Sequence, residues 1–226
     1  MKPIQIYPSI LAADFSSLGQ EIRTVERAGA DGIHFDVMDG HFVPNISFGP
    51  VVLSAIRKTT RLPFWVHLMI TDPQKYASDF IEAGADGLFI HPEINLDIVT
   101  LAKDIQRKGI KPGMAINPET QIEQIKNIIP DFQDFLVMTV HPGFGGQELI
   151  PEILNKIGKI RELAKESGSK AVIHVDGGVN FDTVRDVVLA GTDVLVAGSC
   201  IFKQPDIEDA LKTLRKKAIA SCKAPI

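Results

Sequence analysis

The chain has 226 residues, 45% of them hydrophobic and 23% charged, so it can bury a full core and is neither a disordered nor a fibrous protein. Its net charge of −4 argues against sequence-independent nucleic-acid binding, which needs a dense lysine and arginine face. The two cysteines lack C-x-x-C spacing, no apolar signal core follows Met1, and no apolar run approaches the roughly 20 residues of a membrane span. We therefore expect one domain over residues 1–226 in the cytoplasm, without a nucleic-acid or membrane partner.

Short β-type runs alternate along the chain with longer segments of helical period, and each pair takes roughly the 30 residues of a βα unit. Several runs are apolar almost throughout, which is typical of parallel strands buried on both faces. The helical segments repeat apolar residues three or four positions apart, as Ile153, Ile157 and Ile160 do. The expected strands are Ile4–Pro8, Gly32–Asp36, Phe64–Leu68, Gly87–Ile90, Lys111–Ile116, Phe135–Thr139, Ala171–Asp176 and Val194–Ala197.

A short motif recurs where a helix should end before a strand: Ala28–Asp31, Ala83–Asp86 and Ala190–Asp193 all read Ala-Gly-Ala/Thr-Asp. Its glycine suits the left-handed residue that closes a helix. Asp72-Pro73 and Asn117-Pro118 each predict a capped helix start. Eight units with reused joints predict an α/β (β/α)8 TIM barrel. The alternative, a doubly wound open sheet, lacks a G-x-G-x-x-G after the first strand.

Polar side chains collect at the carboxyl ends of the expected strands, where a barrel carries its chemistry. Ser9 ends the first strand, His34 and Asp36 the second, His67 the third and Asp176 the seventh. His34 and Asp36 are two residues apart and share one face of their strand. Two imidazoles and two carboxylates form a mixed nitrogen and oxygen shell suited to one divalent Zn, Fe, Mn or Co ion.

The alternative is that each histidine is a core residue hydrogen-bonded to backbone, and His91 fits that interpretation best. Asp36 and Asp176 are harder to explain in this way, because a carboxylate buried without a partner is costly. Each therefore needs a cation or access to solvent, and a shared metal would serve both.

Glycine-rich loops follow the sixth, seventh and eighth expected strands. Bare backbone lets several N–H groups converge on an anion, and a phosphate site near strands seven and eight recurs in barrels of this type. Simple tight turns are the alternative, but three such loops at one mouth favour a phosphorylated substrate. The residues are Gly143, Phe144, Gly145 and Gly146, then Gly177 and Gly178, then Gly198 and Ser199.

Three methionines lie at or just past strand ends, namely Met38, Met69 and Met138. A methionine inside a barrel is usually a packing residue. The hypothesis here is that these three line the pocket, where an apolar surface would cover the reacting carbon.

Nearly the whole chain resembles the ribulose-phosphate 3-epimerase family. Several long motifs occur in the family's order, which makes the resemblance specific. They are Pro8–Phe15, Asp36–Asn45, Val66–Met69, Pro142–Gln147 and Val175–Val179.

The resemblance implies a ribulose-phosphate-binding barrel that inverts C3 of D-ribulose 5-phosphate to give D-xylulose 5-phosphate through an enediolate, in the pentose phosphate pathway. By the family's pattern Asp36 and Asp176 exchange the proton as base and acid, and they ligate the metal together with His34 and His67. Ser9, His67 and Asp176 contact the substrate, and the glycine loops bind its phosphate. A homo-oligomer, either dimer or hexamer, is also implied.

Alternatives in specificity and function remain. His91-Pro92-Glu93 and Asn117–Thr120 look closer to relatives that epimerise allulose 6-phosphate, and His141 stands where the family more often has Asn or Glu. A Schiff-base aldolase needs a lysine at a strand end, which no expected strand offers. A related decarboxylase or hexulose-phosphate synthase would show Asp-x-Lys-x-x-Asp at the third strand. A non-catalytic phosphosugar-binding barrel would lack one of the two carboxylates, and both are present.

Overall fold

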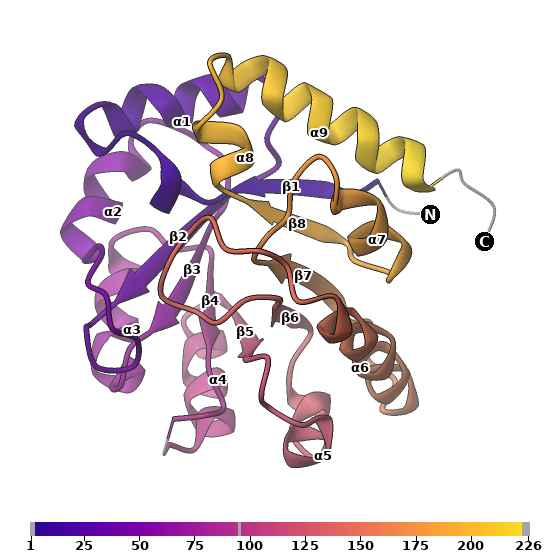
Figure 1. Ribbon diagram of the computed structural model, residues 1–226. Helices are drawn as coiled ribbons and strands as arrows, with labels where there is room; N and C mark the ends of the chain where they lie inside the picture. Colours follow the sequence, from indigo (N-terminus) through magenta and orange to yellow (C-terminus); the bar gives the residue numbers. More distant parts are fainter. Residues whose placement is uncertain (1–2, 95, 223–226) are drawn as a thin grey trace.

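The computed structural model describes residues 3–94 and 96–222. Its eight parallel strands form one sheet that curls into a barrel, in the order β1-β8-β7-β6-β5-β4-β3-β2. An isolated parallel bridge between Ser9 and His34 brings β1 to β2 and completes the ring (Figure 1). The strands are β1 Gln5–Pro8, β2 Ile33–Met38, β3 Phe64–Met69, β4 Gly87–Ile90, β5 Lys111–Ile116, β6 Asp134–Met138, β7 Val172–Asp176 and β8 Val194–Ala197.

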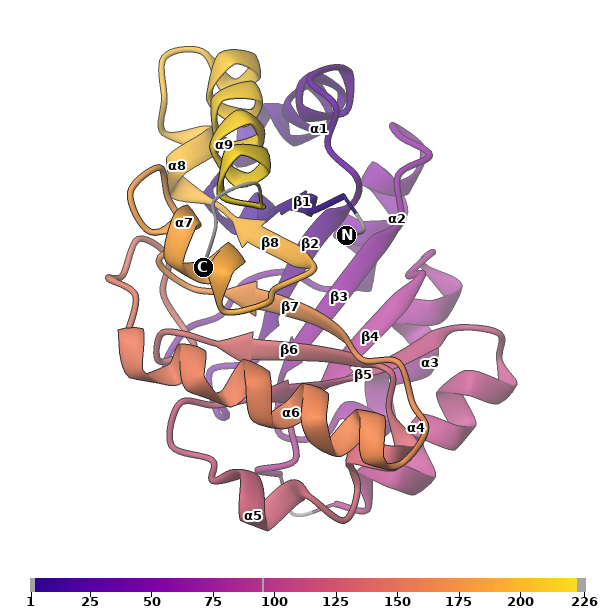
Figure 2. The ribbon, with the colours of Figure 1, turned by 90° about the vertical axis from the view of Figure 1, so that its right-hand side faces the viewer.

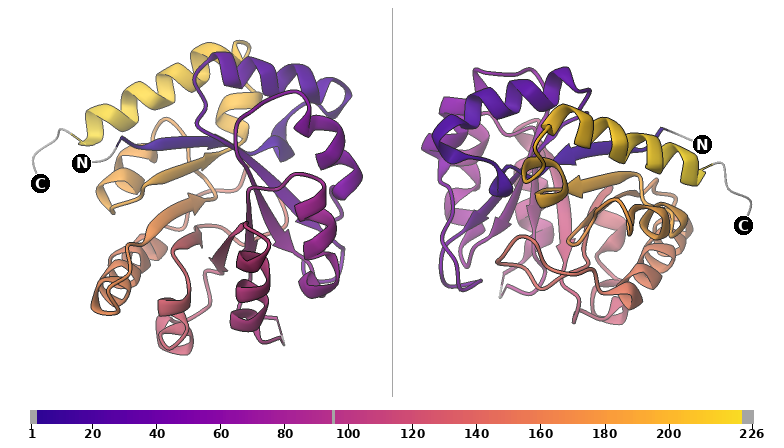
Figure 3. Two further views of the ribbon diagram at one scale, coloured as in Figure 1. Left: turned by 180° about the vertical axis from the view of Figure 1, so that it is seen from behind. Right: turned by 45° about the horizontal axis from the view of Figure 1, so that its top comes forward.

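Helices surround the strands, as the views from behind and from above show (Figure 3). The side view places α6 along the outer side of β6 and β7 (Figure 2). The α-helices are α1 Leu18–Arg27, α2 Pro50–Arg57, α3 Pro73–Glu82, α4 Ile98–Arg107, α5 Ile122–Ile125, α6 Asn155–Glu166, α7 Val184–Leu189, α8 Ser199–Phe202 and α9 Ile207–Cys222. The shorter 3-10 segments are η1 Ile10–Ala12, η2 Phe15–Ser17, η3 Ile129–Asp131 and η4 Pro151–Leu154.

The predicted (β/α)8 barrel is therefore confirmed, and the observed strands differ from the expected ones by at most two residues at an end. The prediction of one domain over 1–226 stays a prediction, and residues 1–2, 95 and 223–226 lie outside the described part. None of the helices described is both long and apolar enough to span a membrane.

The hydrophobic core has two main parts, because each strand alternates its side chains between the helices and the barrel interior. A third, small cluster consists of Met38, Val43 and Met69. The larger part, between barrel and helices, holds fully buried residues such as Phe35, Ile157 and Leu211. The smaller part fills the barrel interior and reaches up to the pocket, with Tyr7, Trp65, Phe89, Ala115, Leu136, Met138, Val140, Val194 and Val196. On the inward face of a strand, each side chain lies two residues after the previous one and closer to the carboxyl mouth. His34, His67 and Asp176 lie at that mouth.

The recurring Ala-Gly-Ala/Thr-Asp motif builds the same joint three times. Its glycines all have left-handed φ angles, as predicted: 96° at Gly29, 106° at Gly84 and 99° at Gly191. Each aspartate then accepts a hydrogen bond of 2.8 Å from the backbone N–H of a neighbouring strand and pairs with an arginine. The three sets are Asp31 with Ile6 and Arg215, Asp86 with Phe64 and Arg57, and Asp193 with Ile173 and Arg161.

One predicted helix start is correct and one is wrong. Asp72 caps α3 by accepting from the backbone N–H of Lys75 at 3.2 Å, with Pro73 as the first helical residue. Asn117-Pro118 begins no helix, and α5 starts only at Ile122. The reason is a contact from α6: the Lys156 ammonium donates to the carbonyls of residues 117, 118 and 120, which holds them in a turn.

Candidate active site

Four side chains converge at the carboxyl mouth, as the sequence predicted. His34 and Asp36 come from β2, His67 from β3 and Asp176 from β7, and their potential ligand atoms all lie within 4.8 Å of one another. Nε2 of His34 lies 3.2 Å from Oδ1 of Asp36 and 3.5 Å from Oδ2 of Asp176. Nδ1 of His67 lies 3.2 Å from the same Asp36 oxygen and 4.0 Å from the Asp176 oxygen. Ser9 adds a hydrogen bond of 2.7 Å from its hydroxyl to Oδ2 of Asp36.

Burial and mutual charge set the protonation of this group. Burial, with the repulsion of Asp36 added, raises the pKa of Asp176 to about 7 despite the nearby His34. Burial would also raise the pKa of Asp36, but the attraction and hydrogen bonding of His34 and His67 outweigh it and lower that pKa. Burial lowers the pKa of His67 to about 3, so its imidazole is neutral near pH 7. Burial alone would lower the pKa of His34, yet Asp36 and then Asp176 raise it.

This donor set fits a divalent cation. Two buried imidazoles and two carboxylates face one another, and the carboxylates repel each other without positive charge between them. Mixed nitrogen and oxygen ligands suit Zn, Fe, Mn or Co better than calcium, which takes oxygen alone. The prediction that these four residues are metal ligands stays a prediction, but the geometry brings all of them together.

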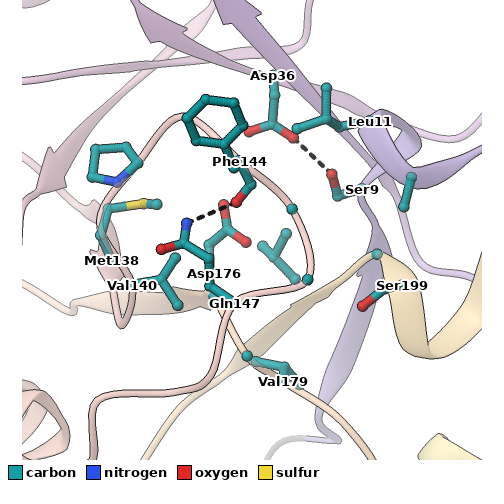
Figure 4. Close-up of a pocket in the computed structure, with 18 of the residues that line it drawn as sticks. Ser9, Leu11, Asp36, Met138, Val140, Phe144, Gln147, Asp176, Val179 and Ser199 are labelled. Carbon is teal, nitrogen blue, oxygen red and sulfur yellow. Dashed lines mark hydrogen bonds between the residues drawn. The ribbon is translucent and has the colours of Figure 1, made fainter. Parts of the chain in front are cut away.

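The glycine loops predicted to bind phosphate border the same pocket as the two carboxylates. The loop after β6 carries Phe144 over the mouth, and Ser199 enters from the loop after β8 (Figure 4). Every residue of the three predicted segments lines this pocket: Gly143, Phe144, Gly145, Gly146, Gly177, Gly178, Gly198 and Ser199.

Met38, Met69 and Met138 all line the pocket too. They are almost completely buried, with exposed fractions of 4%, 1% and 3%, so they form an apolar wall beside the carboxylates. The hypothesis that these methionines face the pocket agrees with their positions. His34 and His67 differ, because both are fully buried beneath the pocket and do not form its surface.

The sequence argument missed Gln147, although the side chain lines the pocket. Its amide nitrogen donates to the carbonyl of Phe144 at 2.8 Å (Figure 4). The same nitrogen donates to the carbonyl of His141 at 2.7 Å, and the two bonds brace the glycine loop from within. Its position as a polar residue directly after a glycine-rich loop was the feature of the sequence that could have identified it as a pocket residue.

His91 was also underestimated. Its ring is buried, but its partners are side chains and not the backbone that the sequence interpretation favoured. Nε2 lies 2.8 Å from Nε2 of His67, and Nδ1 lies 2.9 Å from Oε2 of Glu93. His91 is therefore connected to the cluster of four by way of His67.

Comparison with known proteins decides the family. The model of the ribulose-phosphate 3 epimerase family matches residues 5–202. The chain belongs to the ribulose-phosphate 3-epimerase family. It is 46% identical to the ribulose-phosphate 3-epimerase of Bacillus subtilis over 94% of this chain and 98% of that one. It is 39% identical to that of Escherichia coli K12, over 96% and 97%. The family predicted from the motifs is confirmed, and the chain is an isomerase of this family.

Solved structures of other phosphosugar enzymes share the fold. A 3-hexulose-6-phosphate synthase from Salmonella typhimurium matches with a TM-score of 0.74 and 18% identity, over 96% of this chain and all of that one. A KGPDC from Streptococcus mutans has the same TM-score at 12% identity, over 96% of this chain and 98% of that one. At such identities the likeness supports the barrel and not the family's reaction.

Proposed function

We propose that the chain interconverts D-ribulose 5-phosphate and D-xylulose 5-phosphate by removing the C3 proton on one face and returning a proton on the other. The observation that carries this proposal is the placement of two carboxylates in one pocket, Asp36 from β2 and Asp176 from β7. Inversion next to a ketone needs a base and an acid on opposite faces of the carbon. Asp36 would accept the proton in one direction and Asp176 would supply one, with the roles exchanged in reverse.

His34, Asp36, His67 and Asp176 would hold one divalent Zn, Fe, Mn or Co ion. When bound there, such an ion supplies positive charge for the oxygen that becomes negative as C3 loses its proton. Ser9 holds the Asp36 carboxylate through its 2.7 Å hydrogen bond, which orients the base.

Phosphate binding at a distance from C3 would position the sugar. The glycine loops after β6, β7 and β8 line the pocket with residues that lack side chains, and phosphate bound by their backbone would fix the distance of C3 from the carboxylates. The methionine wall of Met38, Met69 and Met138 would keep water from the reacting carbon.

Pentose specificity is favoured over allulose 6-phosphate. The residues that suggested a hexose relative, His91–Glu93 and Asn117–Thr120, lie outside the set that lines the pocket, and so does His141. They are therefore poorly placed to sense an additional carbon on the substrate. The homo-oligomer, dimer or hexamer, stays a prediction from the family.

The experiment is a comparison of turnover of D-ribulose 5-phosphate and allulose 6-phosphate, before and after chelation and with Zn, Fe, Mn or Co restored one at a time. We expect chelator-sensitive epimerisation that favours the pentose. A preference for the hexose would refute the pentose assignment, and failure to turn over either sugar with any metal would refute the proposed reaction.

A further inference from the structure

A line of hydrogen-bonding groups runs outward from the metal-ligand candidate His67. Its Nε2 meets Nε2 of His91 at 2.8 Å, and Nδ1 of His91 meets Oε2 of Glu93 at 2.9 Å. The other Glu93 oxygen, Oε1, accepts from the backbone N–H of Asn117 at 3.0 Å and from the Thr120 hydroxyl. Both imidazoles are at most 1% exposed, so water does not compete for these contacts.

The contact with Glu93 permits only one direction of donation. The Glu93 carboxylate can only accept, so Nδ1 of His91 must carry a hydrogen. In a neutral His91 the other nitrogen, Nε2, is then an acceptor for Nε2–H of His67. That arrangement leaves the lone pair of His67 Nδ1 for a cation. Without a cation, Oδ1 of Asp36 lies 3.2 Å from Nδ1 and can also only accept, so Asp36 and His91 compete for the His67 hydrogen.

We propose that Glu93 is a positioning residue that holds the hydrogen of His91 on Nδ1, so that Nε2 of His91 can accept from His67 while Nδ1 of His67 binds a metal. The link to a metal rests on the proposed function, whereas the hydrogen on Nδ1 of His91 does not. Metal-bound histidines commonly donate their second ring N–H to such a partner, which fixes the ring and raises the basicity of the ligating nitrogen.

The rest of the barrel holds Glu93 in this role. Lys156 on α6 donates to the carbonyls of Asn117, Pro118 and Thr120 at 3.1, 2.6 and 2.7 Å. That clamp fixes the two donors that bind Oε1 of Glu93 and leaves its Oε2 for His91. The result is a continuous path from an outer helix to the metal-ligand candidate.

His34 lacks a comparable support. Its Nδ1 is buried and, among the residues described, has no hydrogen-bond partner. Of the two candidate imidazole ligands, His67 is therefore the one whose second ring nitrogen is connected to a carboxylate, Glu93, by way of His91.

Glu93→Gln should reverse the direction of hydrogen-bond donation along this line. The Asn117 N–H still requires an acceptor, so it keeps the oxygen of the new amide, and the amide NH2 group turns to Nδ1 of His91. His91 must then accept at Nδ1 and donate from Nε2. His67 accepts at Nε2 and carries its hydrogen on Nδ1, where it blocks metal binding.

The test is long-range proton–nitrogen NMR on the full chain labelled with 15N-histidine, with metal removed by chelation, near pH 7. In the unsubstituted protein we expect a hydrogen on Nδ1 of His91, because Glu93 can only accept. In Glu93→Gln we expect Nδ1 of His91 to lose this hydrogen and Nε2 of His91 to carry one. Glu123→Gln removes an exposed carboxylate from α5 of the same part of the barrel and should leave both signals unchanged.

Affinity for Zn²⁺ and Co²⁺, measured by competition with a chromogenic chelator, is the second readout. We expect Glu93→Gln to weaken binding by about 10–100-fold, and Glu123→Gln to leave it within about twofold of the unsubstituted chain. Thr120→Val keeps the carboxylate and should therefore keep the original tautomers.

Several results would overturn the proposal. A bare Nδ1 on His91 in the unsubstituted chain would do so even if Glu93→Gln failed to fold. An unchanged hydrogen on Nδ1 of His91 in a folded Glu93→Gln protein would do so as well. A chain that turns over neither sugar but shows the expected tautomers would instead refute the proposed reaction and leave the role of Glu93 intact.

Discussion

The two ends of the barrel use the same residue type in opposite ways. At the amino end, Asp31, Asp86 and Asp193 each accept from a strand N–H and pair with an arginine. At the carboxyl end, Asp36 and Asp176 face each other across two imidazoles, and burial and the Asp36 charge raise the pKa of Asp176 to about 7.

The difference separates stability from chemistry. A partly exposed carboxylate paired with a guanidinium holds strands in register, and its charge is balanced. Two buried carboxylates that face each other repel, and that cost is typical of a site that binds a cation or transfers protons. The barrel thus places its arginine-paired aspartates at one end and its mutually facing ones at the other.

The largest effect should come from Asp176→Asn. The amide cannot exchange a proton with C3, so we expect turnover to fall by about a thousandfold or more, while phosphosugar binding persists. The melting temperature without metal should not fall, because a repelling charge is removed. Steady-state kinetics and thermal unfolding measure both. Turnover within about tenfold of the unsubstituted enzyme would contradict the two-carboxylate assignment.

The next largest effect should come from Gly178→Ala. Gly178 has a left-handed φ of 65°, and an added Cβ would lie 2.3 Å from the backbone nitrogen of Leu149. We expect a loss of at least about 2 kcal/mol in unfolding free energy and a raised KM. For the unfolding free energy Gly145→Ala is the matched control, because a Cβ there meets nothing within 4 Å. Equal stability of the two variants would show that the loop after β7 changes its conformation to accommodate the added Cβ without strain.

A smaller effect is expected at the amino end. Asp193→Ala removes the acceptor for the Ile173 N–H and the partner of Arg161, and we expect it to cost about 1–2 kcal/mol of unfolding free energy. Because this joint lies far from the mouth, kcat should stay within about twofold. Chemical denaturation and kinetics measure the two quantities, with Glu162→Ala, an exposed neighbour on α6, as control. A large fall in kcat without unfolding would contradict the proposal that the amino end serves stability and the carboxyl end serves chemistry.

Local sequence was enough for the parts that depend on local chemistry. The strands could be predicted because burial on both faces makes them apolar, and the joints because Ala-Gly-Ala/Thr-Asp needs a left-handed glycine. His34 and Asp36 could be placed together because residues two apart on a strand share a face. His67 and Asp176 followed once the strands were put in barrel order.

Contacts between distant segments could not be predicted in the same way. Asn117-Pro118 resembles a helix start, and only the reach of Lys156 from α6 explains why it forms a turn. His91 resembles a core residue until β4 is placed beside β3 and its ring meets His67. In both places a local pattern was overridden by a hydrogen bond from a segment more than 20 residues away.

The smallest effect concerns His174, which lies two residues before Asp176 on the inward face of β7. Burial lowers its pKa although Asp134 accepts from it at 3.4 Å, so below about pH 6.5 the unfolded chain binds a proton that the folded chain resists. Stability should therefore fall between about pH 7 and pH 5, and His174→Gln should make that fall shallower. Val194→Ala removes packing from the neighbouring position without a titrating group, so its cost should be equal at both pH values. Denaturant unfolding measures the slopes, and identical slopes for His174→Gln and the unsubstituted chain would show that this histidine is protonated as easily inside the barrel as outside it.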